Sequence, residues 1–256
     1  MSASFSFDVQ PPDLVIEPSP LERCLLQVRF SRTPELLDEA TERSLAGDLP
    51  ELPVRNSVRA AVVPLTPDDG GGYETLRTFE SVDGLSRASV ASDFCAYETS
   101  MYTTRDAMLG HAAALMRAVA NARRPARVNR VGIRFTNAFD QVGNLGEWIR
   151  PPLLGWVGAL ADPTALKSQL LYATLAGGQG TEVAVRTALV PAGAVFEPGA
   201  PIADHTRWLL DIDSYDETAR PGFEPGTIGD TLENLAKDAY KVFAWAAEEY
   251  VQRGRG

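Results

Sequence analysis

The chain has 256 residues, enough for one large domain or two small ones at roughly 100 to 200 residues per domain. Hydrophobic residues make up 45% and charged residues 23%, a composition typical of soluble globular proteins, which excludes a disordered or fibrous chain. The formal net charge of −10 argues against the chain as a whole binding nucleic acid or an anionic membrane.

Cysteine content and the amino terminus indicate a cytoplasmic protein. There are two cysteines, whereas a secreted scaffold of disulfide-linked loops carries many more. Residues 1–5 lack the basic and apolar regions of a signal peptide. The longest apolar run, 153–161, is too short for a membrane span, which takes ~20 residues. We therefore expect no integral membrane segment.

The first half of the chain predicts an extended arm, then a strand, a helix and a meander. Four prolines make residues 1–20 extended, and Thr33-Pro34 is typical of a helix start. Alternating apolar residues and turn signals predict the strands. The predicted elements are an arm over 1–20, a helix over 34–46, and strands over 21–31, 57–65, 73–81, 85–91 and 94–102.

A long helix follows the meander, and the order strand, helix, meander, helix is then repeated. Thr104 is a good N-cap for a helix that must end before Pro125. The remaining predictions are strands over 127–138, 166–175, 182–190 and 206–215 and helices over 145–150 and 228–252. We expect the segments 193–205 and 216–227, rich in Pro, Gly and acidic residues, to be loops.

Two strand segments are similar enough to suggest an internal duplication. Residues 26–31 read L-Q-V-R-F-S and residues 131–136 read V-G-I-R-F-T, and a predicted helix follows each. Chance similarity between short strands is the competing explanation. We predict an α+β fold of two related units, each an antiparallel β-meander packed against one long helix. The predicted boundaries are 1–20 for the arm, 21–142 for the first unit and 143–256 for the second.

The last predicted helix carries a continuous apolar stripe. Its apolar residues recur at spacings of three and four, at Ile228, Leu232, Leu235, Ala239, Val242 and Ala246. Such a stripe usually packs on a sheet, and the nearby aromatic residues widen it in favour of that interpretation. A coiled-coil seam between two copies is the alternative.

Several segments resemble an uncharacterised, sporadically distributed bacterial family of about this length. They are the 127–137 strand with its R-x-G-x-R-[YF]-x-N pattern, the D-x-D strand over 210–215, the strand over 20–30 and the last helix with Phe243. Phe135 stands where the family pattern leads us to expect tyrosine. The resemblance implies the fold but no assigned chemistry, and the patchy occurrence implies a role on exchangeable gene cassettes, such as defence or toxin neutralisation.

An arginine-rich segment is the first candidate binding site. No acidic residue occurs within 107–139, which holds six arginines between Arg117 and Arg134. Three of them lie near the end of a predicted helix, where cations favourably meet the helix dipole, and no aromatic residues are interleaved to stack bases. Binding of an anion or of an acidic protein partner is the functional interpretation. The candidate residues are Arg29, Arg123, Arg124, Arg127, Arg130 and Arg134.

Asp211 and Asp213 are the second candidate site. Being two residues apart in a strand, they lie on one face, and two carboxylates can hold Mg²⁺ or Mn²⁺ beside a phosphate. No third ligand or nucleotide-binding glycine motif accompanies them. The alternative is an ion pair, since the fork of Arg29 or Arg134 matches a carboxylate.

No catalytic constellation outweighs its structural alternative. His205 beside Asp204 lacks a G-x-S-x-G turn, and the cysteines lack an electropositive helix start. We therefore predict a non-catalytic cytosolic binding or interaction protein with a protein partner and no cofactor. A homodimer is left open, and neither nucleic acid nor membrane is an expected partner. The alternative is a Mg/Mn-dependent phosphoryl-transfer enzyme or nuclease that uses Asp211 and Asp213.

Thermal unfolding with and without Mn²⁺ tests that alternative. A bound cation raises the melting temperature by mass action, and Asn at either aspartate removes the rise. We expect millimolar Mn²⁺ to leave the melting temperature unchanged. A rise of several degrees that Asp211→Asn or Asp213→Asn abolishes would favour the enzyme.

Overall fold

The computed structural model describes residues 19–62, 72–160, 162, 165–177, 180–196 and 201–253. Of the predicted amino-terminal arm, Ser19 and Pro20 belong to this part, and the rest of the arm lies outside the described residues. Within the described part, no helix is long and apolar enough to cross a membrane.

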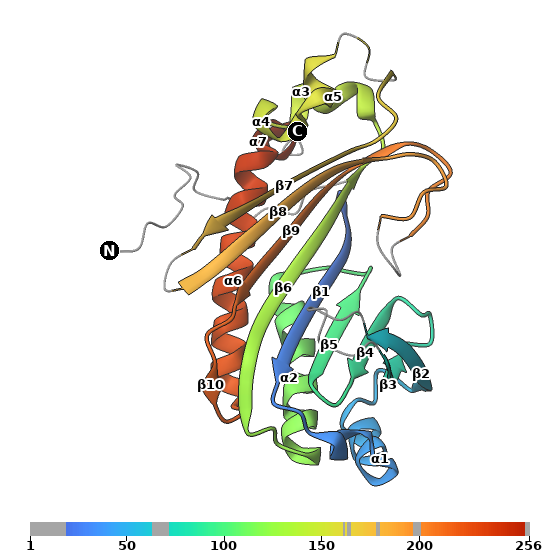
Figure 1. Ribbon diagram of the computed structural model, residues 1–256, viewed down its shortest axis with the longest axis vertical. Helices are drawn as coiled ribbons and strands as arrows, with labels where there is room; N and C mark the ends of the chain where they lie inside the picture. The colour runs from blue at the N-terminus through green and yellow to red at the C-terminus, as the bar shows by residue number, and fades with distance from the viewer. Residues whose placement is uncertain are drawn as a thin grey trace. The chain divides into compact units, whose positions relative to one another are not determined.

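The chain is an α+β protein built on one antiparallel sheet (Figure 1). The strand order is β2-β3-β4-β5-β1-β6-β9-β8-β7, and β10 pairs with β6. The strands are β1 (Leu21–Phe30), β2 (Val54–Val62), β3 (Gly72–Glu80), β4 (Ser86–Val90), β5 (Phe94–Thr99), β6 (Arg127–Phe139), β7 (Gln169–Ala176), β8 (Thr181–Val190), β9 (Arg207–Asp216) and β10 (Arg220–Pro221). The helices are η1 (Pro34–Leu37), α1 (Glu39–Asp48), α2 (Arg105–Ala122), η2 (Val142–Asn144), α3 (Leu145–Trp148), α4 (Pro151–Leu154), α5 (Trp156–Ala159), α6 (Pro225–Ala246) and α7 (Glu248–Arg253).

The residues form two compact units, and neither is a continuous stretch of chain. Unit 1 comprises the described parts of Met1–Arg23, Arg134–Tyr215 and Leu235–Gly256, and unit 2 those of Cys24–Ile133 and Asp216–Asn234. The divisions fall inside β1, β6, β9 and α6, so each of these elements contributes residues to both units. The predicted boundary at 142/143 separates two proposed repeats along the chain, whereas these units are defined by the contacts between residues.

Unit 2 contains the meander β2-β3-β4-β5, with β1 paired to β5. Gly84, with φ of 72°, forms the tight turn between β3 and β4, a backbone conformation that glycine adopts without strain. Helix α2 begins as predicted, because the Thr104 hydroxyl accepts a hydrogen bond from the Ala107 N–H at 3.1 Å. Its apolar stripe, which includes Met108 and Leu115, is buried.

Unit 1 contains β6, β9, β8 and β7, with the carboxyl-terminal part of α6 on one face (Figure 1). The core cluster on this face joins side chains of β8 and β9 to residues of α3–α7, among them Val183, Trp208, Leu210 and Val242. All six residues of the predicted α6 stripe are at most 2% exposed. The stripe therefore packs inside the monomer, as predicted, and is not a coiled-coil seam.

Two predicted helices are wrong in detail. The helix predicted over 34–46 is interrupted at Asp38, whose ψ of 147° is extended, so that η1 and α1 are separate helices. The Thr33 hydroxyl donates to the Ser31 carbonyl and does not cap a helix. The helix predicted over 145–150 ends at Trp148, since a residue that precedes proline, here Arg150, avoids the helical region. The predicted 216–227 loop contains β10 and the start of α6.

Candidate functional site

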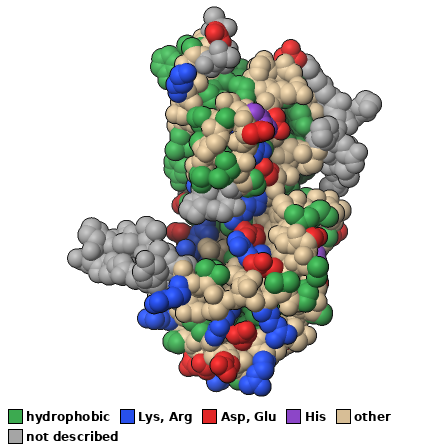
Figure 2. All heavy atoms as spheres, turned by 90° about the vertical axis from the view of Figure 1, so that its right-hand side faces the viewer, with side chains coloured by type: hydrophobic (Ala, Val, Ile, Leu, Met, Phe, Trp, Pro, Cys, Tyr) green, Lys and Arg blue, Asp and Glu red, His purple; other side chains and the backbone are tan. Residues whose placement is uncertain are grey.

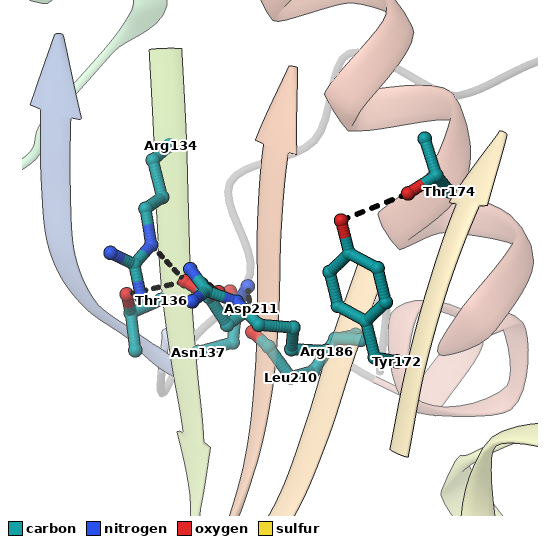
Figure 3. Close-up of polar contacts among 8 residues, drawn as sticks. All are labelled: Arg134, Thr136, Asn137, Tyr172, Thr174, Arg186, Leu210 and Asp211. Carbon is teal, nitrogen blue, oxygen red and sulfur yellow. Dashed lines mark hydrogen bonds and ion pairs between the residues drawn. The ribbon is translucent and has the colours of Figure 1, made fainter. Parts of the chain in front are cut away.

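Asp211 on β9 is the centre of a buried ion cluster in unit 1 (Figure 3). Its side chain has no exposed surface. Oδ1 accepts hydrogen bonds from Arg134 Nε at 2.5 Å and from the Thr136 hydroxyl at 3.1 Å. Arg186 Nε donates to Oδ2 at 2.6 Å, and its Nη2 lies 2.6 Å from the same atom. We call Arg134, Thr136, Arg186 and Asp211 the Asp211 cluster.

The alternation of side chains along each strand assembles the cluster. Strand β9 lies between β6 and β8, and each strand points every second side chain to the same face. Leu210 and Ile212, the neighbours of Asp211, point into the helix-covered core. Asn137 Nδ2 donates to the Leu210 carbonyl at 3.1 Å, so a side chain also ties β6 to β9.

Burial explains why Asp211 has two arginine partners. A carboxylate removed from water is strongly destabilising unless cations and hydrogen bonds replace its hydration. The two guanidinium groups keep some access to water, with side chains 15% exposed for Arg134 and 30% for Arg186. Because two positive charges meet one negative charge, these three side chains together carry a charge of +1.

The pairing predicted for Arg134 is confirmed, and it bears directly on the metal interpretation. Both carboxylate oxygens of Asp211 accept hydrogen bonds from guanidinium groups. Asp213 is half-buried on the same strand face. Among the described residues, no group of three or more His, Cys, Asp or Glu is placed to hold a metal ion. The arrangement orients arginines, and a metal at Asp211 and Asp213 stays a prediction.

Sequence reasoning missed Arg186, and with it the exposed side chains beside the cluster. Arg186 is directly opposite Tyr172 of β7 in the strand register, so both lie on the same sheet face (Figure 3). Tyr172 and Leu170 are each 64% exposed, and the Tyr172 hydroxyl lies 2.9 Å from that of Thr174. A lone arginine inside the apolar strand T-E-V-A-V-R-T-A-L-V was the available signal.

The other predicted arginines contact separate partners. Arg29, Arg123, Arg124, Arg127 and Arg130 belong to unit 2, whereas Arg134 belongs to unit 1. The contacts in unit 2 are Arg124 Nη1 to Glu224 at 3.1 Å, Arg130 Nε to Glu217 at 3.7 Å, Arg127 Nε to Asn129 at 2.9 Å, Arg29 Nε to Gln27 at 3.1 Å, and the Arg123 backbone N–H to the Val119 carbonyl. Figure 2 shows one face of the molecule, on which basic side chains are interspersed with acidic ones and form no continuous basic surface.

A second polar cluster of unit 1 surrounds His205. Nε2 lies 2.9 Å from Asp140 and Nδ1 lies 2.8 Å from Asp204. The hydrogen bonds to Asp140 and then to Asp204 raise the pKa of His205 above its ordinary value of 6.5. Arg207 lies 3.6 Å from the same Asp140 oxygen and donates to Glu22 at 2.7 Å. The adjacent pocket, lined in part by Glu22 and Arg207, has room for little more than a water molecule.

The two cysteines are not candidate nucleophiles. Cys24 and Cys95 are fully buried, and burial raises the pKa of both thiols far above the ordinary value. Both thiols are therefore protonated at neutral pH.

Comparison with protein families and with curated proteins assigns the chain to no family. No protein-family model matches the chain, and no curated protein matches it significantly. The resemblance to a bacterial family of about this length therefore stays a prediction, and the functional argument depends on the geometry of the site.

Replacing Asp211 by Asn tests the structural role of the Asp211 cluster. Because the carboxylate is fully buried, we expect the free energy of unfolding to fall by about 3–5 kcal/mol. Glu224→Gln in the exposed pair with Arg124 is the control, with an expected loss of about 1 kcal/mol or less. Chemical denaturation measures both, and equal losses would contradict the assignment.

The His205 cluster predicts a pH dependence of stability. A raised pKa means that the imidazolium stabilises the folded protein at pH values below 6.5 and that this contribution disappears as pH rises through the higher folded-state pKa. The melting temperature of the wild type should exceed that of His205→Gln at about pH 5.5, and the difference should vanish in alkaline solution. Asp140→Asn should weaken this pH dependence. A difference that grew with pH would refute it.

Proposed function

We propose that the protein is a non-catalytic cytosolic binding or interaction protein whose partner docks beside the Asp211 cluster. The observation that carries this proposal is the position of Arg186. The buried carboxylate of Asp211 holds this side chain, and Arg186 lies directly opposite the exposed Tyr172 in the strand register. We call Arg186, Tyr172 and Leu170, together with Arg134 on the same sheet face, the arginine face.

The composition of the arginine face supports recognition of a protein. Tyrosine and arginine are enriched among the residues that contribute most to protein–protein binding. Arg186 has little conformational freedom left to lose, because Asp211 already fixes its guanidinium, so binding costs less entropy. In unit 1, the described helices pack on the opposite face of the sheet. The arginine face therefore offers an oriented cation beside apolar surface.

Charge indicates the chemistry of the partner. The two guanidiniums and one carboxylate of the Asp211 cluster sum to +1 in a chain of net charge −10. A partner that contributes Asp or Glu side chains next to an apolar patch would complement this local charge and cover Tyr172 and Leu170. We therefore propose an acidic segment of a protein as the partner. The enzymatic alternative gains no comparable support, since guanidinium groups already engage both oxygens of Asp211.

The internal duplication, predicted with units 21–142 and 143–256, remains part of the proposal, although the element order assigns β6 to the second copy and so starts that copy before residue 143. The order strand, helix, meander, helix occurs twice along the chain. In the sheet, β1 lies next to β5, the last strand of its meander, and β6 lies next to β9, the last strand of the second. These parallels support a repeat, although the first copy has an additional strand and the second has three short helices in place of α1. The family resemblance extends the proposal to a defence or toxin-neutralising role.

Affinity capture with single-residue controls tests the proposed function. The tagged protein would be incubated with a lysate of the cells that naturally make it, and captured proteins would be quantified by mass spectrometry. Tyr172→Ala should fold normally, because the side chain is exposed, and should weaken binding of the partner by at least about 2 kcal/mol, roughly 30-fold. Arg186→Gln should weaken it similarly, with its folding checked by chemical denaturation because the variant removes one partner of the buried Asp211. Added salt should slow association.

Arg117→Gln, an exposed arginine of unit 2, is the matched control and should leave capture unchanged. Binding of the purified partner to purified wild type and variants then gives the affinities directly. A partner that binds all three variants as tightly as the wild type would contradict a role for the arginine face.

A further inference from the structure

Strand β7 is an edge strand with unusual composition. It reads Q-L-L-Y-A-T-L-A and contains no charge, proline or glycine. In the part of the chain that the structure describes, β8 is its one strand neighbour. Native proteins usually protect a long apolar edge with charges, proline or a bulge, because its unpaired backbone groups invite another strand. No such device occurs within β7.

The hydrogen-bond pattern identifies which backbone groups point to the open edge. Gly177 donates from its N–H to the Thr181 carbonyl at 2.7 Å, and the β7–β8 register continues without a bulge from that pair. Hydrogen-bonded positions alternate in an antiparallel ladder, so the odd-numbered residues of β7 bond to β8. The even-numbered residues Leu170, Tyr172 and Thr174 therefore direct their N–H and C=O groups outward.

Large exposed side chains flank this edge. Leu170 and Tyr172 are each 64% exposed, and Trp156 of α5 is 65% exposed. Gln169 holds α5 at the start of β7, because its Oε1 accepts from the Trp156 N–H at 2.7 Å and its Nε2 donates to the Leu154 carbonyl at 2.8 Å. An open strand edge with apolar side chains and two exposed aromatic residues is typical of a protein interface.

We propose that this edge binds a second copy of the chain, with the two β7 strands antiparallel about a twofold axis at Ala173. Antiparallel pairing requires that outward-directed residues lie opposite one another, which allows registers centred on Tyr172 or on Ala173. The first stacks two tyrosines on the axis and places Gln169 against Leu175. The second pairs Leu171 with Leu175 of the other copy and Tyr172 with Thr174, so every bulky side chain meets an apolar or small one.

Area and charge both favour a second copy as the occupant. A tryptophan or tyrosine buries about 150–250 Å² when fully covered. Pairing would bury a total accessible surface of roughly 1,000 Å², about the minimum for a biological interface. This area comprises the exposed parts of Trp156, Tyr172 and Leu170 on both copies and the two backbone edges. Two chains of net charge −10 repel each other, and the charge-free β7 adds no like charges to the contact.

This interface shares Tyr172 and Leu170 with the arginine face, but it can be tested at a residue that the arginine face does not include. It depends on the backbone edge and on Ala173, whose side chain points to the sheet face opposite Arg186. Pairing would make the sheets of two copies continuous and would leave the Asp211 cluster accessible. Charge variants at Ala173 therefore test the dimer without altering the side chains that the acidic partner would contact.

Charge variants at the twofold axis test the proposal. Sedimentation equilibrium up to about 100 μM should show wild-type dimers of twice the 27.7 kDa chain mass. Ala173→Glu and Ala173→Lys should each raise the dimer dissociation constant about tenfold or more, because identical charges face one another across the axis. Mixing the two variants should restore dimers, because the charges are then opposite. Ala40→Glu and Ala40→Lys, at an exposed position of α1, are matched controls and should dimerise like the wild type.

Three outcomes would overturn the proposal. They are a wild type that stays monomeric at every concentration, dimers that tolerate either Ala173 charge as well as the Ala40 charge, and mixed Ala173 variants that do not recover. Hydrogen exchange identifies another occupant. Slow exchange of the Leu170, Tyr172 and Thr174 amides in a monomer would mean that another segment or a bound peptide covers the edge.

Discussion

The pairing of a fully buried carboxylate with two arginines is the interaction on which the architecture of unit 1 depends. Asp211 could not be buried alone, and its partners come from the strands on either side, Arg134 on β6 and Arg186 on β8. A one-residue slip of any of these strands would turn a charged side chain toward the apolar core. The cluster therefore specifies strand register in a sheet that apolar residues alone would hold less precisely.

The same alternation separates the two roles of the sheet in unit 1. The helix-covered face carries the buried side chains of Trp208, Leu210 and Ile212. On the opposite face, Asp211 fixes the two arginines. A rigid core thus supports the oriented groups from behind, which keeps the entropy cost of binding low. The function proposed above follows from this division, because Arg186 and Tyr172 lie on the sheet face opposite the helix-covered core.

Sequence periodicity predicted much of the fold but little of the site. Most strands and both long helices were predicted within a few residues, because a period of two or 3.6 is a local property. The pairing of Arg134 with Asp211 was predicted from side-chain chemistry. Arg186, Glu217 and Glu224 were missed because periodicity gives the face of a strand and not its neighbour. The arginine-rich segment has no acidic residue near it in the sequence, but it has acidic partners in the structure. Glu217 and Glu224, about a hundred residues further along the chain, pair with its arginines.

The division of elements between the units has a consequence for biosynthesis. Unit 1 begins before unit 2 in the chain and is completed after it, since its core needs Val242, Ala246 and Val251. At ~5–20 residues per second, an interval on the order of ten seconds separates synthesis of β6 from that of this last core segment. Strands β8 and β9 are made within this interval, and their apolar face lacks the contacts of α6 and α7 until those helices follow. We expect a nascent chain at this stage to expose apolar surface to which chaperones bind, until the final helix leaves the ribosome and closes the core.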